Sequence, residues 1–190
     1  MELANRALVE KARRKDAEAF AALVRIFERV ALSVAYGVLG DGSAAGDVTQ
    51  DAFIRAWERL GELREPERFG PWLCGIVRNL AIDALRRKRM TLPLTAGQVV
   101  VNSERWTSDP IDEVGRRETE SLLAGAIASL DEQSRMVVVM RYYEDLSSKE
   151  IADLLEMTPA AVDMRLSRAR KQLRTLLEGQ PAAQAAGPTA

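Results

Sequence analysis

The chain has 190 residues, of which 47% are hydrophobic, 29% are charged and 5% are aromatic. This balance excludes a largely disordered chain, and the abundance of Ala, Leu, Arg and Glu favours helices over strands. The absence of histidine excludes histidine-dependent catalysis, and the net charge of −1 excludes a uniformly basic nucleic-acid binder.

The longest apolar runs are much shorter than the roughly 18 to 20 residues that a membrane-spanning helix needs. The N-terminus also lacks the charged and then apolar pattern of a secretion signal. We therefore expect a cytoplasmic protein that does not insert into membranes.

Three amphipathic helices are predicted in the first part of the chain. Residues 16–38 have apolar side chains at spacings of three and four, and Gly40, Asp41 and Gly42 end this pattern. A second helix is expected over about 44–60, with an apolar face and an outward acidic face. After a loop over 61–71, a third helix is expected to begin near Trp72 and to bury Trp72 and Ile76, with a polar outward strip. These helices predict a first domain over residues 1–90.

Periodicity disappears after the third helix. Residues 91–117 contain many turn formers, which predict a flexible linker. A second helical domain is expected over 118–178, and the uncharged residues 179–190 are expected to be a disordered tail. The predicted fold class is therefore all-α, with two small helical domains joined by a flexible linker.

The second domain contains three signals for the start of a helix. Ser129 and Glu132 resemble a capping box, and Ser147 and Glu150 repeat it. Thr158 is then expected to be an N-cap with Pro159 at the first helical position. We therefore expect a four-helix domain whose last two helices, about 149–155 and 159–177, form a helix-turn-helix.

Basic residues cluster in two segments despite the near-neutral total. Five cations lie between residues 78 and 89, against the single acid Asp83, and five lie between 164 and 177 with no acid. A basic second helix suits a helix-turn-helix that enters the major groove. Short helix pairs also occur in proteins that never bind DNA, and the helix-turn-helix pattern alone leaves that alternative open.

Three segments in order carry a resemblance to a known family. Residues 47–57 (DVTQDAFIRAW), 68–87 (RFGPWLCGIVRNLAIDALRR) and 130–174 resemble bacterial RNA polymerase sigma factors of the extracytoplasmic-function group. In that family the first segment binds the clamp-helix coiled coil of the polymerase, the second melts the promoter and the third reads the upstream promoter element. The resemblance covers about 17–178.

The resemblance implies a role for each segment. Core-polymerase contacts are expected at Asp47, Gln50, Asp51 and Glu58. Contacts with the minus-ten element are expected at Asn79, Asp83, Arg86, Arg87 and Lys88. Contacts with the minus-thirty-five element are expected at Thr158, Pro159, Ala160, Ala161, Arg165, Arg168 and Lys171. We expect Arg165 to influence base preference and Lys171 to bind phosphate. The loop over 61–69 is expected to help form a pocket for a flipped base.

Two residues depart from the family pattern. Asp163 follows Val162 where the family usually has lysine or another polar residue, so the family's base preference is not carried over. Cys74 stands where an aromatic residue is common, and its neighbours Leu73 and Ile76 favour a small buried core residue over a redox sensor.

These features predict a sigma factor that binds core RNA polymerase and both double- and single-stranded promoter DNA. We expect it to be a monomer when free and to have no catalytic residues, metal or cofactor. An anti-sigma protein is left open as a further partner. The alternative is a stand-alone helix-turn-helix regulator. A nuclease would require Asp47, Asp51 and Glu58 to converge on a metal ion.

Overall fold

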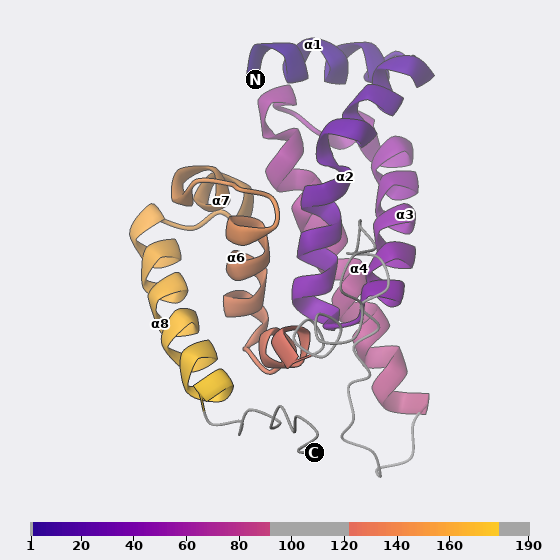
Figure 1. Ribbon diagram of the computed structural model, residues 1–190. Helices are drawn as coiled ribbons and strands as arrows, with labels where there is room; N and C mark the ends of the chain where they lie inside the picture. Colours follow the sequence, from indigo (N-terminus) through magenta and orange to yellow (C-terminus); the bar gives the residue numbers. More distant parts are fainter. Residues whose placement is uncertain (1, 92–121, 179–190) are drawn as a thin grey trace, which may run out of the picture.

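The computed structural model describes residues 2–91 and 122–178, and every regular element in these two ranges is a helix (Figure 1). The first range contains α1 (Glu2–Arg13), α2 (Ala17–Leu39), α3 (Gly42–Arg59) and α4 (Phe69–Thr91), with the 3-10 helices η1 (Leu60–Glu62) and η2 (Pro66–Arg68) before α4. The second contains helical residues 122–128, α6 (Glu132–Tyr142), α7 (Ser148–Leu155) and α8 (Pro159–Glu178). We call the two ranges the first and second units.

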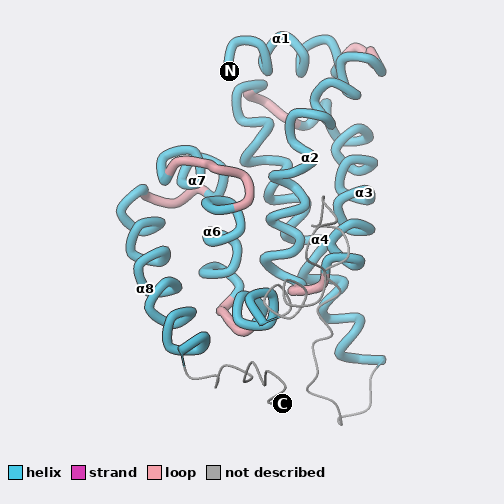
Figure 2. The backbone as a smooth tube through the Cα atoms, viewed as in Figure 1, coloured by secondary structure: helices cyan, strands magenta, loops and turns pink. Residues whose placement is uncertain are grey.

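The predicted all-α fold class is confirmed. Figure 2 shows the short loops that join successive helices within each unit. The predicted linker, except for Thr91 at the end of α4, and the predicted tail lie outside the described residues. Within the described ranges, no helix is both long enough and apolar enough to cross a membrane.

Short polar side chains determine where α2 and α3 begin. The carboxylate of Asp16 accepts a hydrogen bond from the Ala19 amide at 3.0 Å and caps α2. Gly40, with φ of +66°, ends α2 in the left-handed conformation that glycine adopts most easily. Asp41 then caps α3 through the amides of Ser43 and Ala44. Both helices therefore lie within two residues of their predicted bounds.

Two predicted helix starts are wrong. α4 begins at Phe69, not near Trp72, because the 3-10 turn at Pro66–Arg68 leads directly into it, and Pro71 is tolerated in the first turn of a helix. The capping box at Ser129 is also wrong. The N-cap of α6 is Asp131, which accepts from the Ser134 amide at 3.0 Å, whereas the Ser129 hydroxyl donates to the Ala126 carbonyl.

The core of the first unit forms around α2, which packs against α1, α3 and α4. Leu23 and Val34 of α2 and Leu73 and Val77 of α4 are fully or almost fully buried. Cys74 lies in the same cluster with 4% of its surface exposed. Burial raises the pKa of the Cys74 thiol to about 12, which agrees with the prediction of a buried core residue.

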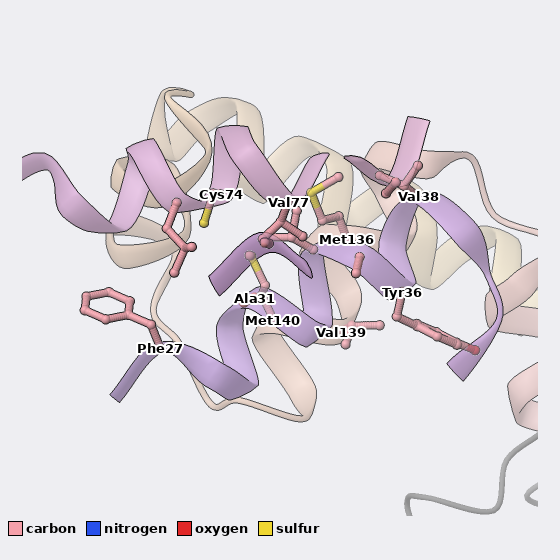
Figure 3. Packing of buried hydrophobic residues seen from close by; sticks show 14 of the residues in the cluster. Phe27, Ala31, Tyr36, Val38, Cys74, Val77, Met136, Val139 and Met140 are labelled. Carbon is pink, nitrogen blue, oxygen red and sulfur yellow. The ribbon is translucent and has the colours of Figure 1, made fainter. Parts of the chain in front are cut away.

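The second unit shares this core. α6 packs on α2, and the cluster of buried side chains is continuous across the two units. Figure 3 shows Met136 and Met140 of α6 beside Ala31 of α2 and Val77 of α4. α8 packs on the side of α6 away from α2, and α7 contacts both α8 and α4 (Figure 1).

The burial of Cys74 leads to a test of core packing. We expect the folded protein to react negligibly with a thiol reagent such as dithionitrobenzoate at pH 8, because the thiolate is the reactive form and burial suppresses it. The same protein in concentrated guanidinium chloride should react completely within minutes. Rapid reaction in native buffer would contradict this position for Cys74.

Candidate functional site

The outward face of α3 is acidic. Asp47, Gln50, Asp51 and Glu58 are all exposed, because their spacing places them opposite the small residues that pack into the core. The structure therefore brings together on one helix face the four residues that the sequence predicted there. Ile54 lies among them with 58% of its surface exposed. This face is acidic with an apolar centre, which the sequence analysis did not predict.

A shallow apolar groove adjoins this face. It is lined by Ala17, Phe20, Phe53, Ile54 and Trp57. Phe53 is buried and Trp57 is half-buried, with the Trp57 ring 4.9 Å from that of Phe20. An exposed isoleucine beside a half-buried tryptophan provides an apolar contact surface next to the carboxylates. The signal in the sequence was that Ile54 lies off the apolar stripe of its helix.

The outward strip of α4 is longer than predicted. Asn79, Asp83, Arg86, Arg87 and Lys88 are all exposed, as expected for this strip. The Lys88 ammonium lies 3.6 Å from the carboxylate of Asp41. Ile76 and Trp72 precede Asn79 at helical spacings of three and four residues, so they lie on the same face of α4. Both residues are half-buried rather than buried as predicted, because the loop before α4 leaves one side of each uncovered.

A groove connects this strip with the loop that precedes α4. Arg59, Arg64 and Arg68 line it, together with Trp72, Asn79 and the carboxylate-bearing Glu156 of the second unit. The guanidinium groups can neutralise phosphates, and the indole offers a face on which a base can stack. The structure thus brings together the predicted loop and the predicted strip. The sequence analysis did not single out these three arginines, because Arg59 ends α3 and Arg64 and Arg68 lie in the segment between α3 and α4, where helical periodicity gives no indication of a shared groove.

The helix-turn-helix has the predicted start signals. Ser147 and Glu150 form both bonds of a capping box at α7. The hydroxyl of Thr158 accepts a hydrogen bond from the Ala161 amide at 3.2 Å, and Pro159 is the first residue of α8. Glu156 joins the two helices in the left-handed conformation, with φ of +53°. Thr158, Pro159 and Ala160 are exposed at the start of α8, and Ala161 is half-buried.

The basic residues of α8 do not all point outward. Val162, Leu166 and Ala169 form its buried face, so Met164, Ser167, Arg168 and Lys171 are exposed on the other side. Arg165 is half-buried beside α6 and lines a small pocket with Arg78 and Gln133. Partial burial raises the pKa of Asp131, but hydrogen bonds from Ser134 and the charge of Arg165 outweigh that effect and lower it. Arg165 therefore interacts with its own domain.

Asp163 has a partner within the helix-turn-helix. The Ser148 hydroxyl donates a hydrogen bond to the Asp163 carboxylate at 2.5 Å and joins the first turn of α7 to α8. The Asp163 carboxylate is therefore engaged by a hydroxyl of the neighbouring helix.

The carboxylates of α3 do not form a metal site. Asp47, Asp51 and Glu58 follow one another along a single helix face. In the two ranges that the structure describes, no group of three or more Asp, Glu, Cys or His side chains could hold a metal ion. The structure therefore does not support the nuclease alternative.

Family models match both units of the chain. Sigma-70 region 2 matches residues 23–91, and Sigma-70, region 4 matches residues 121–173. Region 2 includes the acidic face and the groove, and region 4 includes the helix-turn-helix. The two matches together cover more than half of the chain.

Individual relatives agree with these matches. ECF RNA polymerase sigma factor SigW of Bacillus subtilis is 31% identical over 186 residues, which are 93% of this chain and 98% of SigW. RfaY of Xanthomonas campestris, named as a probable RNA polymerase sigma factor, is 34% identical over 84% of this chain, but the match spans only 40% of RfaY. The structure of CnrH in complex with the cytosolic domain of CnrY aligns with a TM-score of 0.66 and 26% identity, covering 94% of this chain and 99% of CnrH.

Proposed function

The chain belongs to the extracytoplasmic-function group of RNA polymerase sigma factors, and we propose that three of its surfaces each carry out one part of promoter recognition. The acidic face of α3 binds core RNA polymerase, the groove beside α4 holds a separated DNA strand, and α8 reads duplex DNA upstream. The chain carries no catalytic chemistry of its own and acts in the cytoplasm.

The observation that most supports this proposal is the groove between the loop and α4. It combines arginine side chains, a half-buried indole and the Asn79 amide in one concave surface. Single-stranded DNA needs cations for its backbone and an aromatic platform for its bases. In this proposal, Arg64 and Arg68 neutralise phosphates, Trp72 stacks on a base, and Asn79 and Asp83 form hydrogen bonds with base edges that are exposed only after the strands separate.

The α3 face is acidic and has an apolar centre, so it suits a basic protein partner that also offers an apolar contact. The carboxylates of Asp47, Asp51 and Glu58 provide charge complementarity, and Ile54 with the adjacent groove provides an apolar contact. The clamp-helix coiled coil of the polymerase, which the family resemblance implies, fills this role in the proposal. Because this face is acidic, promoter DNA is repelled from it.

The exposed face of α8 is proposed to enter the major groove. Arg168 and Lys171 lie on that face, and Met164 lies beside them with 49% of its surface exposed. An arginine can form two hydrogen bonds with guanine, and an apolar side chain can contact the methyl group of thymine. Five further residues flank this face at its N-terminal end: Thr158, Pro159, Ala160, Ala161 and Arg165.

Reconstitution tests the proposal as a whole. The purified chain, added to core RNA polymerase of the source bacterium, should start transcription at specific positions on genomic fragments. Failure to start at any site, or a footprint on duplex DNA that does not depend on polymerase, would instead favour a stand-alone regulator. A cytosolic protein domain comparable to that of CnrY in complex with CnrH is a candidate partner that would reduce this activity.

The polymerase-binding face can be tested by charge reversal. We expect Asp51→Arg to weaken binding to core RNA polymerase by about 2 kcal/mol, or roughly 30-fold, because it brings like charges together at an interface. Glu28→Arg reverses another exposed carboxylate, on α2, and is the matched control. Titration with labelled polymerase measures the affinity of both variants for core RNA polymerase. Equal affinities for the two variants would remove α3 from the interface.

The strand-binding strip can be tested by separating melting from docking. We expect Asn79→Ala and Asp83→Ala to form closed complexes normally but open complexes slowly, because the strip meets bases only after strand separation. A premelted promoter should restore activity, whereas a misfolded or undocked protein would fail on both templates. Normal permanganate reactivity of thymines on duplex promoter would exclude the strip from melting.

The orientation of α8 predicts that its arginines contribute unequally to discrimination between promoter and random duplex. We expect Arg168→Ala to lose roughly 1 to 3 kcal/mol of discrimination between promoter and random duplex, the usual range for a base contact. Arg165→Ala should lose less, because Arg165 is half-buried beside Asp131. Competition binding in the presence of polymerase measures both losses. A larger loss of discrimination for Arg165→Ala would reverse the proposed ranking.

A further inference from the structure

Helix α1 lies across one end of the first unit, next to the segment that leads into α4 (Figure 1). It contacts η1 and η2 as well as α2. Residues 60–68, which we call the entry segment, contain both 3-10 helices and carry Arg64 and Arg68 of the proposed strand groove. The match to Sigma-70 region 2 begins at residue 23 and does not include α1. The contacts of α1 therefore indicate a role that the family match does not assign.

The entry segment consists of two single 3-10 turns and the residues between them. The Leu63 amide donates to the Leu60 carbonyl at 3.3 Å and closes the first turn. The Arg68 amide donates to the Glu65 carbonyl at 2.9 Å and closes the second. Single turns of this kind fix a chain less firmly than an α-helix does. Contacts with neighbouring elements therefore help to determine where the arginines of this segment lie.

Apolar packing joins α1 to the entry segment. Val9 and Ala12 of α1 are fully or almost fully buried. They belong to the same cluster of buried side chains as Leu60 and Leu63. One face of α1 is therefore committed to the core beside the entry segment, and the opposite face is exposed to solvent.

An ion pair adds a second connection. The Arg6 guanidinium of α1 lies 2.9 Å from the carboxylate of Glu67 in η2. Arg6 also donates to the carboxylate of Glu10, one turn along α1, at 3.3 Å. Of the residues that the structure describes, Arg68 lines the groove, whereas Arg6 and Glu67 lie outside its lining. The pair therefore acts on the residue immediately before a groove arginine without reaching the groove.

This ion pair adds little to the stability of the fold. The side chain of Arg6 is 53% exposed and that of Glu67 is 44% exposed. Exposed ion pairs contribute little to stability, because water and salt screen them. Such a pair can still restrict the position of a three-residue turn. Its loss should therefore loosen the entry segment without unfolding the first unit.

We propose that α1 is a positioning element for strand capture, in which the pair of Arg6 with Glu67 holds η2 where Arg68 reaches the groove. This proposal rests on the proposed function of the groove. A segment that is held in place before the strand arrives loses less conformational freedom when the strand binds. Arg6 and Glu67 are therefore positioning residues that act through Arg68.

Charge reversal separates positioning from general electrostatics. Arg6→Glu makes the chain more acidic and Glu67→Arg makes it more basic, so a general charge effect on DNA binding acts in opposite directions in the two variants. Loss of the pair acts in the same direction in both. We expect each variant to slow open-complex formation by about two- to tenfold, the cost of ordering one or two side chains on binding. The double variant, which restores the pair with its charges exchanged, should recover most of the parent rate.

The rates are measured with the full chain bound to core RNA polymerase, on a promoter found by the reconstitution. The dependence of the opening rate on holoenzyme concentration separates closed-complex formation from the opening step. We expect closed-complex formation, affinity for core polymerase and the thermal unfolding temperature to stay unchanged. Arg13→Glu reverses another exposed cation of α1 and is the matched control. It should open the promoter at the parent rate.

Hydrogen–deuterium exchange tests the position of the entry segment without DNA. Amides in a loosened turn open more often and exchange faster. Peptides that cover residues 60–68 should therefore exchange faster in Arg6→Glu and in Glu67→Arg, and at the parent rate in the double variant. Unchanged exchange in both single variants would overturn the proposal.

The outcomes distinguish this proposal from the function on which it rests. Opening rates that change in opposite directions in the two single variants, or a double variant as slow as either, would overturn the positioning role and leave the sigma-factor function intact. An unchanged opening rate despite faster exchange, or an equal loss in Arg13→Glu, would also overturn it. Failure of the parent to initiate transcription would instead refute the proposed function, while the exchange rates would still show whether the pair holds the entry segment.

Discussion

Burial of the apolar face of α6 against α2 and α4 is the interaction on which the rest of the structure depends. Met136, Val139 and Met140 are almost completely buried, and they join the cores of the two units. α7 and α8 bury few apolar side chains of their own, so the helix-turn-helix relies on α6 for most of its packing. This dependence also places the turn of the helix-turn-helix beside the groove that Arg64, Arg68 and Trp72 line. Packing that stabilises the small second unit therefore positions Glu156 over Arg68.

The net charge of −1 is the sum of 27 basic and 28 acidic side chains, and many of them are segregated by sign over the surface. Carboxylates line the outward face of α3, whereas arginines line the groove beside α4 and the exposed side of α8. One chain can therefore attract a basic protein surface and a nucleic acid at the same time, without the two partners competing for one site. Some of these opposite charges pair between the two units, Arg68 with Glu156 and Arg78 with Glu132.

Much of this architecture could be predicted from local sequence signals. Asp16, Gly40 and Thr158 act on backbone groups within a few residues, so the sequence alone placed the corresponding helix ends closely. Ser129 misled the prediction because Asp131, two residues later, is an equally good cap. The half-exposed position of Trp72, the inward turn of Arg165 and the docking of the two units could not be predicted. Each depends on which helix packs against which, and periodicity within one helix does not contain that information.

The position of Asp163 shows how packing constrains recognition in a small helix-turn-helix. The two helices share few buried side chains, so a hydrogen bond at 2.5 Å from Ser148 adds an exposed polar link that helps maintain their angle. A carboxylate engaged in this way is less available to accept a hydrogen bond from a cytosine amino group. If α8 enters the major groove as proposed, base readout falls to the neighbouring exposed positions, Met164, Ser167 and Arg168. In the proposed recognition, the acid that departs from the family pattern therefore leaves base contacts to residues further along the helix, because its own polar capacity is used within the protein.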